Sequence, residues 1–353
     1  MEKLKHKALT FDDVLLLPRY SDFLPSEASI KSHLTKSISL KMPLLSAAMD
    51  TVTESRMAIS LAEAGGIGII HKNNSIDSQA AEVRAVKKYE SGIVRDPVTI
   101  NSQKTIGELR QLTSELSISG MPVVDDGNLK GIVTGRDFRY AENMEAKVAT
   151  IMTPLSKLVT VKEGFSQEDV MKLMYKNRIE KVLVIGEDDA LTGLVTMKDI
   201  EKSAQHPDAT KDTSGRLQVG AALGTGVDTL DRAQALYESG VDVYVIDSAH
   251  AHSKNVIDTI KKIKSTFKDI DVIGGNIATS EAALELVKAG ADAVKVGMGP
   301  GSICTTRIIA GIGVPQISAI LDIKNALKKT DINIIADGGI RSVSYTHLRA
   351  HET

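Results

Sequence analysis

The sequence predicts an α/β protein built on a (β/α)8 TIM barrel, and three observations support this prediction. Short apolar runs alternate with helical patterns between residues 43 and 73, and again from residue 217 onward. Continuous apolar runs are typical of strands buried on both faces, and strand–helix alternation implies a parallel sheet. Polar residues follow the carboxyl ends of several runs, which is where such a barrel gathers its active site. The stretch 93–207 has a different character and contains an internal repeat, so we interpret it as an insertion in a barrel loop.

Seven strands are expected, one fewer than a closed barrel needs. In chain order they are residues 43–50, 66–73, 217–223, 241–248, 271–276, 293–299 and 332–339. Helices are expected around 57–62, over 229–239, around 256–263, from a cap at Ser280 to Gly290, and around 317–328. A doubly wound sheet would also place ligands at the strand ends. However, the dinucleotide fingerprint that opens a helix is missing, because GMGPGS at 297–302 lacks its spacing.

The insertion is predicted to contain two copies of one small module. Residues 97–138 recur as 158–200, and each copy is expected to form a strand, a helix, two strands and a helix. Two Thr–Asp pairs occupy matching places at a strand-to-helix junction: Thr134 with Asp137, and Thr196 with Asp199. Such a pair could cap the helix, or it could bind the ribose and phosphate of a nucleotide.

The composition excludes several function classes. Lys and Arg number 43 against 45 Asp and Glu, so the chain lacks the basic excess of a dedicated nucleic-acid binder. Aromatic residues make up 3% with no Trp, which argues against base-stacking platforms. The single cysteine permits no intramolecular disulfide. The N-terminus has no apolar signal core and no run is long enough to span a membrane, so a cytoplasmic location is expected.

The densest chemical signal is GMGPGSICTT at 297–306. Its three glycines let the backbone approach a ligand or an ion closely. The only cysteine, Cys304, follows them, and a thiolate is the strongest nucleophile among side chains at neutral pH. Thr306 lies two residues further on and could contact the same substrate. The alternative is a tight turn with a small buried thiol.

Three further strand ends hold candidate ligands. Asp337 in IADGGI could accept hydrogen bonds from a ribose diol, while Gly338 and Gly339 present N–H groups to a phosphate. A polar turn is the alternative there. Asp247 ends another strand and is favoured as a ribose acceptor over a zinc site with the nearby histidines, His250 and His252. Met49 could pack on a planar base or simply in the core.

Taken together, seven motifs resemble, in order, those of the bacterial-type inosine 5′-monophosphate (IMP) dehydrogenase family. They are LTFDDVLLLP (9–18), SAAMDTVTE (46–54), GGIGIIHKN (65–73), VIDSAHAHS (245–253), GGNIATSEAA (274–283), VGMGPGSICTTR (296–307) and IADGGIR (335–341). The likeness covers about residues 3–341, and the insertion is similar to the tandem cystathionine-β-synthase (CBS, or Bateman) modules of that family. It implies a discontinuous catalytic barrel (1–92 and 208–341) and a CBS pair (93–207) with repeats at about 94–150 and 153–207.

The resemblance implies NAD-dependent oxidation of IMP to xanthosine 5′-monophosphate, a step of guanine nucleotide biosynthesis. Cys304 would form a covalent thioimidate at C2 of the purine, assisted by Thr306. The residues implied to bind substrate are Ser302, Asp337, Gly338, Gly339 and Met49. Those implied to face NAD are Asp247, Ser248, Asn276, Gly297, Met298 and Gly299. A potassium ion would lie on the carbonyls of Gly299, Gly301 and Cys304.

The resemblance also implies a homotetramer, and purine nucleotides at the CBS pair near Thr134, Asp137, Thr196 and Asp199. It stops after Arg341, because residues 342–353 fit neither the family nor a further βα unit and resemble a cloning, assembly or frameshift scar. An eighth strand, a second phosphate loop and a flap with Arg and Tyr are therefore expected to be missing, and the chain by itself is expected to be inactive. Two alternatives stay open: a guanosine monophosphate (GMP) reductase, and a nucleotide-sensing module on an inactive barrel.

Overall fold

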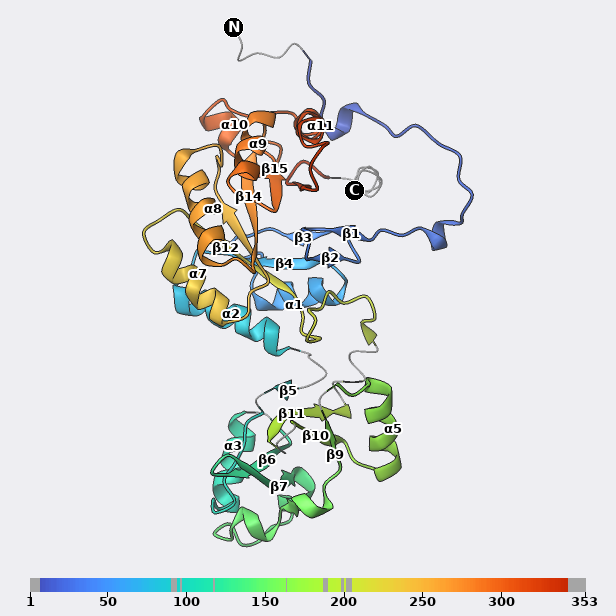
Figure 1. Ribbon diagram of the computed structural model, residues 1–353, viewed down its shortest axis with the longest axis vertical. Coiled ribbons are helices and arrows are strands. Elements are labelled where there is room, and N and C mark those ends of the chain that lie inside the picture. The colour runs from blue at the N-terminus through green and yellow to red at the C-terminus, as the bar shows by residue number, and fades with distance from the viewer. Residues whose placement is uncertain are drawn as a thin grey trace. The chain divides into compact units, whose positions relative to one another are not determined.

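The computed structural model describes residues 7–89, 94–95, 97–116, 118–162, 164–186, 190–197, 200 and 205–341. It divides into two compact units, Met1–Tyr89 with Asp208–Thr353, and Glu90–Pro207 (Figure 1). The predicted insertion, 93–207, falls within the second unit. The predicted scar at 342–353 lies outside the described residues.

A seven-stranded parallel sheet forms the centre of the first unit. Its strands are β3 (Leu45–Ser46), β4 (Ile67–Ile70), β12 (Val219–Leu223), β13 (Val243–Asp247), β14 (Asp271–Ile277), β15 (Ala293–Val296) and β16 (Asn333–Ala336). They lie in the order β16-β15-β14-β13-β12-β4-β3, and each neighbouring pair is parallel. Figure 1 shows the sheet curling from β3 and β4 toward β14 and β15. The predicted parallel α/β fold is therefore confirmed, with all seven expected strands in place.

Helices cover the outer face of this sheet. They are α1 (Ser55–Glu63), α2 (Ile76–Lys88), α7 (Thr229–Glu238), α8 (Lys254–Thr266), α9 (Ser280–Lys288) and α11 (Gln316–Ala326). A short exposed helix, α10 (Thr306–Ile309), belongs to the loop after β15 and has no buried residue. One predicted cap is wrong by a residue. Thr279, not Ser280, caps α9, because its extended backbone lets its hydroxyl accept the N–H of Ala282 at 3.3 Å. The Ser280 hydroxyl instead donates to the carbonyl of Asp322 in α11.

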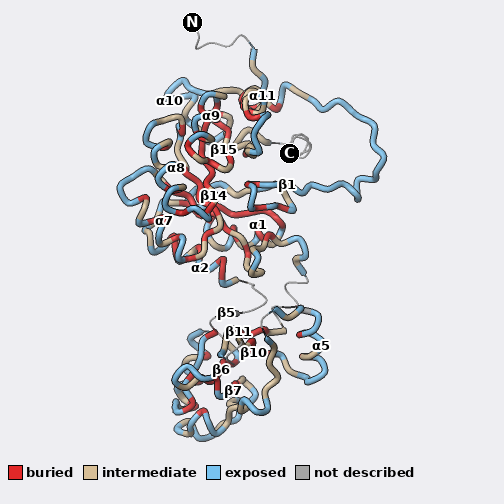
Figure 2. The backbone as a smooth tube through the Cα atoms, in the orientation of Figure 1, coloured by how far each residue is buried: buried red, intermediate tan, exposed pale blue. Residues whose placement is uncertain are grey.

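Buried residues run along the central strands of the sheet (Figure 2), and alternation along the strands divides them into two apolar layers. Val243 and Val245 of β13 lie inside the curl, whereas Tyr244 and Ile246 pack against the outer helices. The inner layer also receives Leu40 from a two-stranded hairpin, β1 (Ser32–His33) and β2 (Ser39–Leu40). No described helix has both the length and the apolar character needed to span a bilayer.

The second unit is built from two similar halves. The first contains β5 (Val94–Arg95), α3 (Ile106–Glu115), β6 (Gly120–Asp125), β7 (Asn128–Thr134) and α4 (Gly135–Phe138). The second contains β8 (Thr153–Pro154), β9 (Thr160–Lys162), α5 (Gln167–Asn177), β10 (Lys181–Ile185) and β11 (Leu191–Thr196). The first strand of each half pairs with a strand of the other half. β5 of the first half pairs with β11 of the second, and β8 of the second half pairs with β7 of the first. Ile132 and Leu194, at matching places, join one apolar cluster that holds the halves together.

Candidate active site

The loop after β15 holds Cys304 in a tightly turned backbone. Gly297 has a φ of +157°, and a Cβ there would lie 2.0 Å from the carbonyl oxygen of Asp337, so only glycine fits. The N–H of Cys304 donates to the carbonyl of Gly301 at 3.1 Å, which closes the turn. This geometry brings the residues after β15 against those after β16.

The thiol of Cys304 is half-buried and lies 3.3 Å from the hydroxyl of Thr306. Hydrogen bonds from the Thr306 hydroxyl and backbone N–H lower the pKa of Cys304, and the backbone of Gly299 adds to this effect. A lowered pKa increases the thiolate fraction at neutral pH, and the thiolate is the nucleophilic form. The predicted pairing of Cys304 with Thr306 therefore has the geometry of an activated nucleophile.

The turn after β16 places Asp337 beside the cysteine loop. Gly338 and Gly339 both have φ above +80°, and a Cβ on Gly338 would lie 3.2 Å from the backbone nitrogen of Gly301. The carboxylate Oδ2 of Asp337 accepts hydrogen bonds from Asn276 Nδ2 at 2.8 Å and Lys295 Nζ at 3.1 Å. Two segments about 35 residues apart in the sequence are thus joined at one edge of the sheet.

Asp247, at the end of β13, is held between two lysines. Its Oδ1 lies 3.0 Å from Lys295 Nζ, and its Oδ2 lies 3.3 Å from Lys72 Nζ. Burial favours the neutral acid, but the two ammonium groups outweigh it and lower the pKa of Asp247. The side chain is therefore ionised at neutral pH.

Asn276 and Ser248 also lie at this edge of the sheet. Asn276 Nδ2 donates to the carbonyl of Gly297 as well as to Asp337, both at 2.8 Å. The backbone N–H of Ser248 donates to the carbonyl of Gly275, and its own carbonyl accepts the N–H of Asn276. These contacts join the ends of β13, β14 and β15 into one surface.

Lys72 and Lys295 are the site residues that the sequence reasoning missed. Both side chains contact a predicted site carboxylate, and Lys295 is nearly buried. A signal was present for Lys295, because a lysine in the otherwise apolar run AVKV requires a buried counter-charge.

Other predicted residues lie further out. Met49 is 41% exposed and lines an open pocket of about 520 Å³ together with Asp50, Lys72 and Arg232. Ser302 is exposed on the cysteine loop. His252 contacts Glu285 at 3.2 Å, and no group of three or more metal-ligating side chains occurs in the described part of the chain, so the zinc alternative gains no support.

In the second unit, Thr134 and Asp137 contact each other. The backbone N–H and the hydroxyl of Thr134 both donate to Asp137 Oδ2, at 2.6 and 2.9 Å, which is a capping arrangement. Both residues also line a cavity of about 590 Å³ that contains Arg136 and Lys181. Thr196 ends β11, and Asp199 lies outside the described residues.

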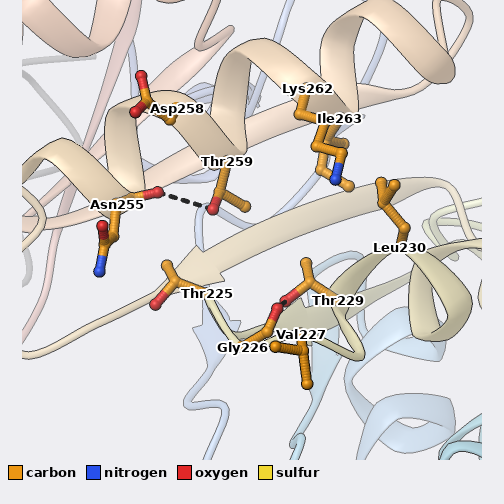
Figure 3. Close-up of a pocket in the computed structure, with 10 residues that line it drawn as sticks. All are labelled: Thr225, Gly226, Val227, Thr229, Leu230, Asn255, Asp258, Thr259, Lys262 and Ile263. Atoms are coloured by element: carbon orange, nitrogen blue, oxygen red, sulfur yellow. Dashed lines mark hydrogen bonds between the residues drawn. The ribbon is translucent and has the colours of Figure 1, made fainter.

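A pocket of about 240 Å³ lies away from all of these residues, between the loop before α7 and helix α8 (Figure 3). Two of its hydroxyl groups bond to nearby backbone: Thr259 donates to the carbonyl of Asn255 at 2.7 Å, and Thr229 to that of Gly226 at 2.8 Å. It contains no predicted site residue.

Comparison with known proteins identifies the family. Residues 8–348 match the model of the IMP dehydrogenase / GMP reductase domain. The chain belongs to the IMP dehydrogenase / GMP reductase family. The predicted resemblance is confirmed at this level, and the curled sheet is that of a TIM-barrel family.

Several relatives within this family are named IMP dehydrogenases. One from Pasteurella multocida is 53% identical over 342 residues, which covers 97% of this chain and 70% of the relative. One from Escherichia coli K12 is 51% identical with the same coverage. Among solved structures, a GMP reductase from Trypanosoma brucei in complex with guanosine 5′-triphosphate matches with a TM-score of 0.89 and 38% identity, covering 99% of this chain and 84% of that one.

Proposed function

We propose that this chain carries the site for NAD-dependent oxidation of IMP to xanthosine 5′-monophosphate, with Cys304 as the nucleophile. The observation that supports this most directly is the packing of the Gly338 turn on the Gly301 turn. That packing brings a carboxylate suited to a ribose diol next to an activated thiol. The names of the relatives support the choice of IMP as substrate.

The substrate residues have complementary chemistry. Asp337 uses Oδ2 for Asn276 and Lys295, and its Oδ1 has no hydrogen bond to the residues that the structure describes. Oδ1 can therefore accept a ribose hydroxyl. Ser302, Gly338 and Gly339 provide a hydroxyl and backbone N–H groups for the phosphate, and Met49 provides a soft apolar surface for the purine.

Cys304 acts in two steps. Its thiolate attacks C2 of the hypoxanthine ring and forms a C–S bond, and loss of hydride from C2 leaves a thioimidate. Water then attacks C2 and releases one proton to the solvent, the C–S bond breaks, and the thiolate leaves with the electron pair. The Thr306 hydroxyl stabilises the thiolate at both ends of this cycle, because it lies within hydrogen-bonding distance of Sγ.

We propose that the strand ends also hold a dinucleotide and a cation. NAD, when bound, supplies the hydride acceptor. Asp247, Ser248, Asn276 and the Gly297–Met298–Gly299 turn would hold it, and the close approach of Gly297 to Asp337 leaves backbone rather than side chain at that surface. The carbonyls of Gly299, Gly301 and Cys304 are hard oxygen donors from one turn, and they would hold a potassium ion.

The second unit is proposed to bind purine nucleotides as a regulatory CBS pair, in the cavity lined by Thr134 and Asp137. Thr196 and Asp199 would have the matching role in the other half. The cationic side chains of Arg136 and Lys181 suit phosphate groups. We further propose that the protein works in the cytoplasm as a homotetramer.

The deciding experiment compares two reactions. IMP dehydrogenase activity predicts NAD reduction with IMP, whereas GMP reductase activity, which the Trypanosoma brucei structures make the second candidate, predicts NADPH oxidation with GMP. Cys304→Ala should abolish NADH formation, including a single burst of one NADH per Cys304, and leave IMP affinity within about tenfold, because only the covalent step is lost. IMP binding with neither reaction, and without even a single burst of NADH, would support the nucleotide-sensing alternative.

A further inference from the structure

Lys295 is a charged residue in the apolar interior of the curled sheet. It lies two residues after Ala293 on β15, so both side chains are on the inner face of the sheet. Its neighbours there include Val245, Ile273 and Ile335. Only 16% of the lysine side chain is exposed. Burying an ammonium group is costly unless it is paired, so the position requires an explanation.

The strand register explains how Lys295 reaches two carboxylates. Asp247 of β13 pairs with Gly275 of β14, and Gly275 pairs with Lys295 of β15, so the three residues form one row across the sheet. A Cβ on Gly275 would lie 2.5 Å from the Cβ of Lys295. The glycine therefore leaves the space through which the lysine crosses a whole strand to Asp247. On its other side, the same ammonium contacts Asp337.

The charges in this row are matched. Burial opposes the charged form of Lys295, but the carboxylates of Asp337 and Asp247 outweigh it and raise the pKa of the lysine. The ammonium group is therefore permanently charged near neutral pH, and it contacts both carboxylates at 3.0–3.1 Å. Without Lys295, the two partly buried carboxylates would have one lysine between them, Lys72, which among the described residues bonds to Asp247 and not to Asp337.

We propose that Lys295 is a positioning residue that orients Asp337 toward the substrate ribose and Asp247 toward the dinucleotide at the same time. The inference rests on the proposed function, since it concerns the same two carboxylates. By occupying Oδ2 of Asp337, Lys295 and Asn276 direct Oδ1 outward as the acceptor. One ammonium group thus connects the substrate half of the site to the cofactor half.

The test measures equilibrium IMP binding by calorimetry, and thermal unfolding, for three variants of the full chain. Lys295→Met removes the charge but keeps a long side chain, and should weaken IMP binding by about tenfold to a hundredfold. Lys295→Arg keeps the charge and should restore most of the affinity. Lys264→Met is the matched control, because Lys264 forms a similar partly buried pair with Asp292 at 2.8 Å, at the amino end of the same strands.

A merely structural role predicts a different pattern. In that case Lys295→Met and Lys264→Met would both lower the unfolding temperature and leave IMP affinity unchanged. That result would overturn the inference about Lys295 but not the proposed function. If the unaltered chain bound no IMP, the proposed function would be wrong and the inference with it. The losses from Lys295→Met and Asp337→Asn should also be less than multiplicative when combined, because both act on one contact.

Discussion

The activation of Cys304 by Thr306 gives the sharpest test of the site. Thr306→Val removes the hydroxyl that lies 3.3 Å from Sγ and keeps the shape of the side chain. Because that hydrogen bond is the largest cause of the lowered pKa of Cys304, the variant should have a higher thiol pKa. The thiol is the only one in the chain, so alkylation by iodoacetamide reports on it alone.

The size of the effect follows from two opposing terms. A lost hydrogen bond of about 1 kcal/mol lowers the thiolate fraction about fivefold at pH values below the thiol pKa. The remaining thiolate is more basic and hence more reactive, with a Brønsted coefficient of about 0.4–0.5. The net alkylation rate of Thr306→Val should therefore fall only about two- to threefold at low pH.

At high pH the order of the rates should reverse. Once both proteins are fully ionised, the more basic thiolate of Thr306→Val should react about twofold faster than the unaltered protein. The two pH–rate curves should then cross, which mass spectrometry of the alkylated chain would show. Thr305→Val is the control, because among the described residues no hydrogen bond joins the Thr305 hydroxyl to Sγ of Cys304. Superimposable curves for Thr306→Val and the unaltered protein would refute the role of Thr306.

Three further predictions concern binding and stability. Asp337→Ala should weaken IMP binding by about 2–4 kcal/mol in calorimetry, since charge-assisted bonds in a partly buried site are lost; an unchanged affinity would remove Asp337 from the site. Lys87→Met should lower the urea unfolding free energy by about 3–5 kcal/mol, because the buried Nζ lies 2.9 Å from both Asp212 and Asp242; a loss below about 1 kcal/mol would contradict this. Deleting residues 93–207 and joining the ends should leave IMP binding by the barrel intact; loss of its cooperative unfolding would show that the insertion is structural.

The positions of the central strands could be predicted from the sequence because these strands are covered on both faces. Residues 219–223 and 243–246 are all buried, so no polar residue interrupts either run. The meeting of Cys304 with Asp337 followed from the rule that parallel strands bring their carboxyl ends to one edge. The family resemblance then supplied the roles that geometry alone left open.

Elements with weaker patterns were missed. Helix α2 has only Ala80, Val83 and Val86 as its buried apolar residues, and its other residues are mostly polar. The β1–β2 hairpin has two residues in each strand, too few for an alternation to be recognised. In both cases the tertiary contacts, rather than the local pattern, determine the structure.

The contacts of Lys295 with Asp247 and Asp337 could have been predicted in part from the sequence. Alternation in β15 places Lys295 on the same face as Ala293, and the continuity of the apolar run indicates that this face is buried. A buried ammonium group needs an anion within reach, and the same strand-end rule already placed Asp247 and Asp337 at that edge. The one fact the sequence does not show is the register that aligns Gly275 between Asp247 and Lys295. Because register depends on how neighbouring strands pair, and a slip of one residue would turn Lys295 to the opposite face, the contact could be inferred only from the folded sheet.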